Sequence, residues 1–141
     1  MYWDANNLYG GAMCEYLPYK NLRIDNDVSL EVVLNTSDDD DVGYIIECDL
    51  HVPQEIYAKL KEFPPCPETM SITEAMLSPY QKQLAKKNNV KIGGCSKLVP
   101  HLMDKVKYCI HYKNLKFIKG LGIKTGPVHN VVSFTQKPFL K

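Results

Sequence analysis

Apolar and polar positions follow several short patterns along this chain rather than one long pattern. The clearest is the segment 42–50, where period-two alternation and apolar richness predict a strand buried on much of both faces. Weaker alternation predicts strands over 1–5, 105–112 and 128–134, with Lys105 and Lys107 on a basic rim of the second of these. Because short strands and helices are mixed in an irregular order, the pattern predicts an α+β fold and not a doubly wound sheet.

Helical spacing and end signals predict four short helices. Pro18 stops the first, Ser78 and Pro79 begin the third with a cap followed by proline, and Gly122 ends the last. The predicted ranges are 8–16, 53–63, 78–87 and 114–121.

Charge is distributed unevenly, although the net charge is only +1. Residues 1–70 hold 4 Lys/Arg and 14 Asp/Glu, a balance of −10, whereas residues 71–141 hold 13 and 2, a balance of +11. Clustered lysines gain affinity by displacing counterions from phosphates, so the second half is expected to face a polyanion. Two alternatives stay open: the halves neutralise each other within the molecule, or the acidic half binds a basic partner. The expected boundary lies within residues 64–75, giving parts 1–70 and 71–141.

Other candidate chemistry is weak. The five cysteines are odd in number and widely spaced, so reduced thiols and no zinc site are expected. The four aspartates at 38–41 are expected in a solvated loop, because consecutive side chains diverge and like charges repel. No signal peptide or apolar run of membrane-spanning length is present, which predicts a soluble intracellular protein of the nucleus or cytoplasm.

The segment Tyr2-Trp3-Asp4-Ala5-Asn6-Asn7-Leu8-Tyr9-Gly10 places one carboxylate between an aromatic run and a helix start. A carboxylate at the end of a strand is a hard oxygen ligand, which suits Mg²⁺ bound jointly with nucleotide phosphates. The alternative is that Asp4 caps the helix while Tyr2, Trp3 and Tyr9 fill a core. Local chemistry leaves both interpretations open.

The sequence Asp4-x-Asn6-Asn7-Leu8-Tyr9-Gly10-x-Ala12-Met13 resembles motif A of family B DNA polymerases, in the protein-primed branch of viruses, organellar plasmids and Maverick/Polinton transposons. The usual form of this motif is Asp-x-x-Ser-Leu-Tyr-Pro, so Asn7 replaces the serine and Gly10 the proline. A second block, residues 97–116, resembles the segment that follows motif A in the transposon members. With Ser78-Pro79-Tyr80-Gln81 and Phe134-Thr135-Gln136, the resemblance covers nearly the whole chain.

This resemblance implies a partial polymerase palm (strand, turn, helix and further strands) with an inserted basic α+β subdomain. It implies template-directed deoxynucleotidyl transfer that uses two Mg²⁺ ions, a DNA template-primer and deoxynucleoside triphosphates, with a terminal protein as a candidate primer. Asp4 would be the catalytic aspartate and, with the backbone carbonyl of Ala5, a metal ligand. Tyr9 would lie beneath the incoming sugar and exclude a ribose 2′-hydroxyl. The nucleotide-binding residues would be Ala5, Asn6, Asn7, Leu8 and Tyr9.

The same resemblance implies DNA contacts in the basic block, with lysines on phosphates and tyrosines stacked on exposed bases. These residues would be Lys97, Lys105, Lys107, Tyr108, Tyr112, Lys113 and Lys116. The sequence contains neither the Lys-x-x-x-Asn-Ser-x-Tyr-Gly block (motif B) nor the Asp-Thr-Asp block (motif C) of the family. A polymerase fragment that is inactive alone is therefore expected. The alternative is a non-catalytic nucleic-acid-binding module derived from such a polymerase.

Overall fold

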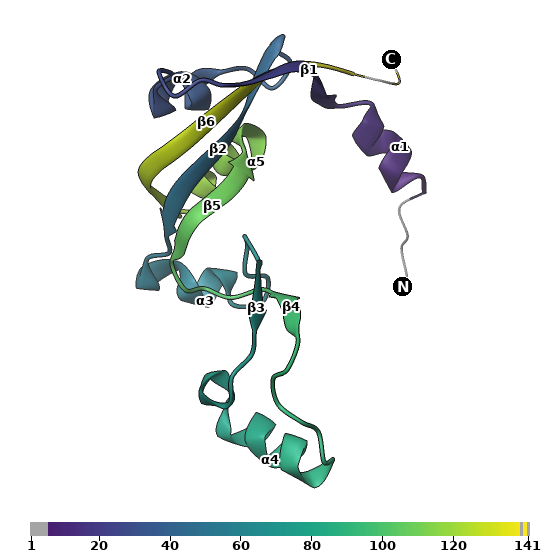
Figure 1. Cartoon of the computed structure of the whole chain (residues 1–141), viewed down its shortest axis with the longest axis vertical. Coiled ribbons are helices and arrows are strands. Elements are labelled where there is room, and N and C mark those ends of the chain that lie inside the picture. The colour runs from purple at the N-terminus through teal and green to yellow at the C-terminus, as the bar shows by residue number, and fades with distance from the viewer. Residues whose placement is uncertain (1–5, 139, 141) are drawn as a thin grey trace. The chain divides into compact units, whose positions relative to one another are not determined.

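The computed structural model describes residues 6–138 and 140 (Figure 1). The chain forms two compact units: unit 1 is Met1–Pro53 with Asp104–Lys141, and unit 2 is Gln54–Met103. Unit 2 is therefore an insertion within unit 1. This division differs from the boundary expected near residue 70, because residues 104–138 return to unit 1 and pair with strands from the first half of the chain.

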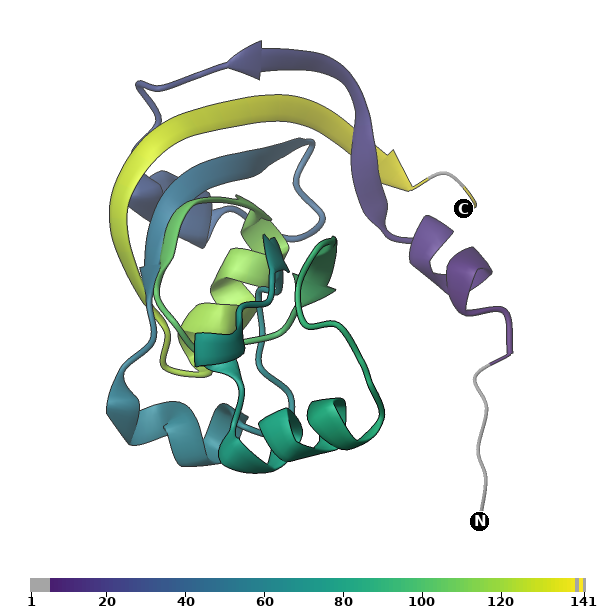
Figure 2. The same cartoon turned by 60° about the horizontal axis from the view of Figure 1, so that its bottom comes forward.

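Unit 1 is built on a four-stranded antiparallel sheet in the order β1-β6-β2-β5. Its strands are β1 (Tyr16–Ile24), β2 (Val42–His51), β5 (Lys105–His111) and β6 (Lys124–Pro138). The sheet curls, and Figure 2 shows β6 and β2 curving around the helix α5 (Tyr112–Gly120). The expected α+β class is confirmed.

The strand predicted from alternation, β2, lies between two partners in this sheet. One of its faces carries the buried side chains of Ile46, Cys48 and Leu50, and the other carries the half-buried Glu47 and Asp49. Further core residues come from α5, from β6 and from α2 (Leu30–Asn35), which Ser29 caps by accepting from the Val32 amide at 3.3 Å. The core thus joins residues from both halves of the sequence.

The curl of the sheet has a local cause at Asp49. Between Cys48 and Leu50, two residue steps on β2 face three steps on β5 and three on β6, so both neighbouring strands bulge at the same place. Lys107 adopts φ 52° in the β5 bulge, and its amide donates to Asp49 Oδ1 at 2.8 Å. Bulges of this kind bend a strand and increase its twist. The Asp49 carboxylate therefore supports the β5 bulge at Lys107.

The aspartate loop, residues 36–41, is exposed as expected, but side chains of α5 and β6 hold its backbone by hydrogen bonds. The Tyr112 hydroxyl lies 3.0 Å from the Ser37 carbonyl oxygen, and Gln136 Nε2 donates to that hydroxyl at 2.8 Å and to the Asp40 carbonyl at 2.7 Å. Lys116 Nζ donates to the Thr36 carbonyl and to Asp38 Oδ1. A lysine from the basic half of the sequence therefore neutralises an aspartate from the acidic half within unit 1. This agrees with the alternative in which the two halves neutralise each other within the molecule.

Tyr112→Phe is expected to lower the free energy of unfolding by about 1 to 3 kcal/mol, because it leaves the buried Gln136 amide and a loop carbonyl without their hydroxyl partner. Urea denaturation measures the change. The matched control Tyr80→Phe, at a side chain that is 71 % exposed, should stay within about 0.5 kcal/mol of the wild type. Equal stability of Tyr112→Phe and the wild type would contradict the anchoring role.

Unit 2 holds short elements around a two-stranded antiparallel pair, β3 with β4. The elements are the 3-10 turns η1 (Gln54–Ile56) and η2 (Glu74–Met76), the helices α3 (Tyr57–Leu60) and α4 (Pro79–Lys87), and the strands β3 (Glu68–Ser71) and β4 (Ser96–Val99). The predicted cap of α4 is confirmed as a capping box between Ser78 and Gln81.

Several predicted boundaries need correction. The first helix, α1, ends at Met13, because Tyr16 already pairs with Pro138 at the start of β1 and Gly10 and Gly11 disfavour a longer helix. The helix predicted over 53–63 is shortened to η1 and α3, which end at Leu60. Tyr112 begins α5 rather than ending a strand. The strand predicted over 1–5 lies outside the described residues.

Candidate functional site

The segment that resembles motif A is described only in part. Asp4 and Ala5, the expected metal ligands, lie outside the described residues, and the description begins at Asn6. Asn7 is the N-cap of α1 (Leu8–Met13), with φ 54° and ψ 45°, and its side-chain oxygen accepts from the Gly10 amide at 3.2 Å. Asparagine is one of the few residues that adopt this left-handed conformation readily. The helix therefore starts through Asn7, and Asp4 is not its N-cap.

Gly10 lies close to the capping side chain. A Cβ atom added at Gly10 would overlap the carboxamide of Asn7, which folds back over the first turn. A larger residue at position 10 would therefore require this carboxamide to shift. Glycine at position 10 thus fits the contact between the Asn7 side chain and the Gly10 amide.

Tyr9 projects from the first turn of α1 with 87 % of its surface exposed, and none of the residues of this helix is buried. Leu8 is also exposed. The structure therefore contradicts the interpretation in which Tyr9 fills a core. An exposed ring one position inside a helix start can lie against a planar or cyclic group of a ligand.

The basic block needs correction at two of its seven predicted DNA contacts. Lys105 is only 2 % exposed and Tyr112 is 0 % exposed, so neither lies at the surface, where DNA binds. Tyr112 is buried because it forms the first turn of α5 and holds the aspartate loop. The alternation in the sequence suggested the opposite orientation for Lys105, and the bulge at Lys107 reverses it.

The remaining predicted contacts divide into two groups. Lys113 and Lys116 are half-buried and form ion pairs with Glu15 at 3.7 Å and Asp38 at 2.9 Å. Part of their charge is therefore neutralised inside unit 1. Lys97 in unit 2 and Lys107 in unit 1 are exposed, and Tyr108 is half-buried. Of the predicted lysines, Lys97 and Lys107 keep the exposure that a phosphate contact needs.

The structure draws attention to a segment that the resemblance did not single out. Residues 75–103 of unit 2, here called the acid-free segment, contain five lysines and no Asp or Glu. Two of the lysines, Lys82 and Lys86, lie one turn apart on α4 and line the same surface pocket as Glu74. The five are Lys82, Lys86, Lys87, Lys91 and Lys97. A capped helix with lysines four apart was the sequence signal for this surface.

Two histidine–carboxylate pairs lie along β2. His129 Nε2 is 2.8 Å from Asp49 Oδ1, and His51 Nδ1 is 2.8 Å from Asp104 Oδ2. The Lys107 amide and His129 hold the pKa of Asp49 below its usual range. His51, with the Val52 amide, does the same for the pKa of Asp104.

The Asp104 pair has an architectural role. It joins the end of β2 to the start of β5, the two points where the chain leaves and re-enters unit 1. The strands β2 and β5 therefore stay paired as far as Leu50 and Lys105, next to the insertion of unit 2. Within residues 6–138 and 140, no group of three or more His, Cys, Asp or Glu side chains could hold a metal ion.

These lowered pKa values predict an acid dependence of stability. The folded pKa of Asp49 lies below its ordinary value of 3.8, so its stabilising effect is complete above about pH 4 and is lost as the pH falls through the folded pKa. Asp49→Asn keeps an oxygen for the Lys107 amide and removes the charge. Its free energy of unfolding should therefore fall less between about pH 4 and pH 2 than that of the wild type. Urea midpoints across this range measure the slopes, and parallel slopes would refute the assignment.

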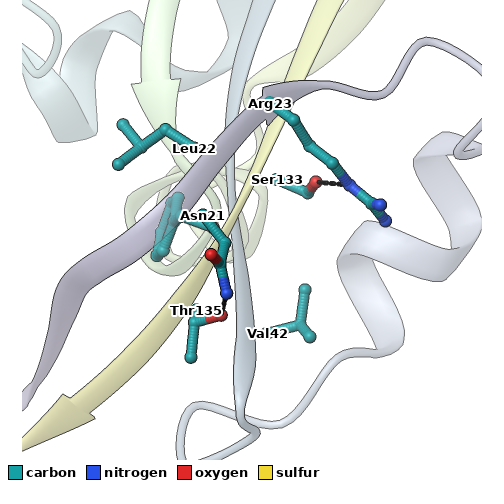
Figure 3. A pocket seen from close by; sticks show the side chains of 7 residues that line it. Asn21, Leu22, Arg23, Val42, Ser133 and Thr135 are labelled. Carbon is teal, nitrogen blue, oxygen red and sulfur yellow. Dashed lines mark hydrogen bonds between the residues drawn. The ribbon is translucent and has the colours of Figure 1, made fainter.

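A pocket of about 510 Å³ opens along β1 and β6 (Figure 3). It forms where the pairing of these strands shifts register and Asn21 adopts φ 57°. Asn21 Nδ2 donates to Thr135 Oγ1 at 3.1 Å, and Arg23 Nε donates to Ser133 Oγ at 3.1 Å. Arg23 is also paired with Asp25 at 3.2 Å. The polar side chains of the pocket are therefore already hydrogen-bonded to one another. The irregular pairing of β1 and β6 accounts for the pocket without a ligand.

Comparison with family models, curated proteins and solved structures gives no match to this chain. None of the helices in the described part of the chain is long and apolar enough to cross a membrane.

Proposed function

We propose that this chain carries the motif A part of a DNA-directed DNA polymerase of the protein-primed family B branch, which catalyses template-directed deoxynucleotidyl transfer. The observation that supports this most is the start of α1, where Asn7 caps the helix and leaves Tyr9 exposed two positions later. A structural tyrosine would be expected to pack against neighbours, whereas this one is available to a ligand.

In this proposal the residues before the cap hold the metal and the residue after it contacts the sugar. Asp4 and the carbonyl of Ala5 would bind Mg²⁺, which when bound neutralises triphosphate charge and activates the primer hydroxyl. The exposed ring of Tyr9 would lie beneath the incoming deoxyribose and leave no room for a 2′-hydroxyl. Asn6, Asn7 and Leu8 would direct backbone amides toward the phosphates.

The residues proposed to contact DNA are the lysines whose side chains are exposed to solvent. Lys97 and Lys107 are exposed, and so are Lys86, Lys87 and Lys91 of the acid-free segment, whereas Lys82 is half-buried. Clustered lysines attract phosphates in a way that depends on salt and not on base sequence. The partners would be a DNA template-primer and deoxynucleoside triphosphates, with a terminal protein as a candidate primer.

The acid-free segment also favours a second function, a non-catalytic nucleic-acid-binding module. Primer extension separates the two. The assay uses a completed polymerase, defined as this chain joined to segments of a family B polymerase that supply motif B and motif C. Template-directed extension with Mg²⁺ and deoxynucleotides supports the polymerase. Salt-dependent retention of DNA without extension supports the binding module.

A further inference from the structure

Unit 2 has very little core for its size. All of its residues, 54–103, are described, and only Leu60 and Cys66 are buried apolar side chains. Large apolar side chains such as Met76 and Leu84 are instead half exposed. A surface of this kind is typical of segments that bury their apolar groups against a partner.

The apolar side chains line a continuous groove. One pocket, of about 520 Å³, is lined chiefly by Met70, Ile72, Met76, Leu77, Val99 and Met103. A second pocket, of about 310 Å³, is lined by Leu84, Ala85, Val90 and Ile92 and shares Leu77 and Gln81 with the first. The two pockets together, here called the methionine groove, run from β3 to α4.

The charge beside the groove is mainly positive, although Glu68 pairs with the groove residue His101 at 3.0 Å and Glu74 lines a neighbouring pocket. The five lysines of the acid-free segment lie on α4, on β4 and on the loop between them, the same elements that line the groove. No Asp or Glu occurs in residues 75–103. Unit 2 as a whole holds 7 Lys and 4 Glu, so a partner that lies in the groove meets apolar walls and an excess of positive charge at the edge.

We propose that the methionine groove binds an acidic, amphipathic polypeptide segment. Its apolar face enters the groove, where methionine side chains adapt to irregular shapes. Its carboxylates face the lysines, which adds electrostatic complementarity. This proposal stands on unit 2 alone and does not depend on the polymerase proposal.

Nucleic acid fits the groove less well, although it shares the attraction to lysine. Single-stranded bases bind by stacking on aromatic rings. The residues that line the two pockets include no Phe, Tyr or Trp, and their one imidazole ring, His101, is paired with Glu68 at 3.0 Å. Aliphatic and thioether walls favour aliphatic side chains of a polypeptide.

The test uses the whole chain and a fluorescent model peptide of about 18 residues, built from Glu, Ala and Leu with Leu at helical i, i+3, i+4 and i+7 spacing. Fluorescence anisotropy compares it with a scrambled peptide of the same composition. The amphipathic peptide should bind about tenfold more tightly than the scrambled one, because only it presents an apolar face. Equal affinity of the two peptides would overturn the proposal.

Two variants and a control locate the site. Met76→Asp should weaken the amphipathic peptide about tenfold, because it places a carboxylate in the groove against an acidic ligand. The double variant Lys86→Glu with Lys87→Glu should weaken it by reversing the charge at the edge. The matched control Phe63→Ser removes an apolar side chain outside the groove and should change nothing.

The variants also distinguish the peptide from nucleic acid. Duplex and single-stranded oligonucleotides should lose affinity in the lysine variant but not in Met76→Asp, because phosphates contact the lysines and not the groove. Unchanged peptide affinity in Met76→Asp would overturn the proposal. So would a loss of DNA affinity in Met76→Asp as large as the loss for the peptide, since the groove would then be a nucleic-acid site.

Discussion

Asp4→Asn is expected to reduce primer extension by the completed polymerase about 10³-fold or more. A metal-bound carboxylate contributes several kcal/mol of charge stabilisation to two-metal nucleotidyl transfer, and about 4 kcal/mol corresponds to a factor of 10³. The amide keeps the shape of the side chain but is a poor ligand for Mg²⁺. Single-nucleotide incorporation under saturating deoxynucleotide measures the effect.

The control for this substitution is Asp27→Asn, which removes the same charge from an exposed position near the start of α2 and should leave the rate unchanged. Binding of template-primer by the Asp4 variant should also stay near the wild-type level, because the lysines carry that contact. Robust extension by Asp4→Asn would show that the metal assignment is wrong.

Tyr9→Val should relax discrimination against ribonucleotides by about 10- to 100-fold while leaving deoxynucleotide incorporation nearly intact. Steric overlap in a well-fitted site costs about 1 to 3 kcal/mol, which is the free energy released when the ring is removed. Because Tyr9 is exposed in the structure, its replacement should not destabilise the fold. The measurement is the ratio of kcat/KM for a deoxynucleotide to that for the matching ribonucleotide.

Tyr9→Phe is the matched variant, since it keeps the ring and removes only the hydroxyl. It should discriminate as the wild type does. If Tyr9→Val discriminates as strongly as Tyr9→Phe, the ring does not contact the sugar and Tyr9 is only an exposed residue of α1.

The sequence predicted the elements whose signals are local. Alternation predicted β2, and the serine-proline start predicted α4 with its cap. The strand β1 was missed because Pro18 and the left-handed Asn21 interrupt its alternation. Its partner among the described strands, β6, supplies paired residues more than a hundred positions later in the sequence. Pairing at that distance leaves no trace in a local pattern.

The candidate site shows the same division between local and long-range information. The helix start at Asn7 and the exposure of Tyr9 follow from a few neighbouring residues. Burial of Lys105 and Tyr112 depends on a bulge and on a loop some seventy residues earlier in the chain. The domain boundary was misplaced for a related reason, since the step in charge near residue 70 does not coincide with the insertion of unit 2.

Primer extension by the wild-type completed polymerase tests the central proposal most directly. A labelled primer on a defined template, with Mg²⁺ and all four deoxynucleotides, should be extended, and omission of one deoxynucleotide should stop the product at the template position that requires it. Extension that follows the template in this way is the predicted result. A folded protein that retains the same template-primer in a salt-dependent manner but adds no nucleotide would contradict the polymerase proposal.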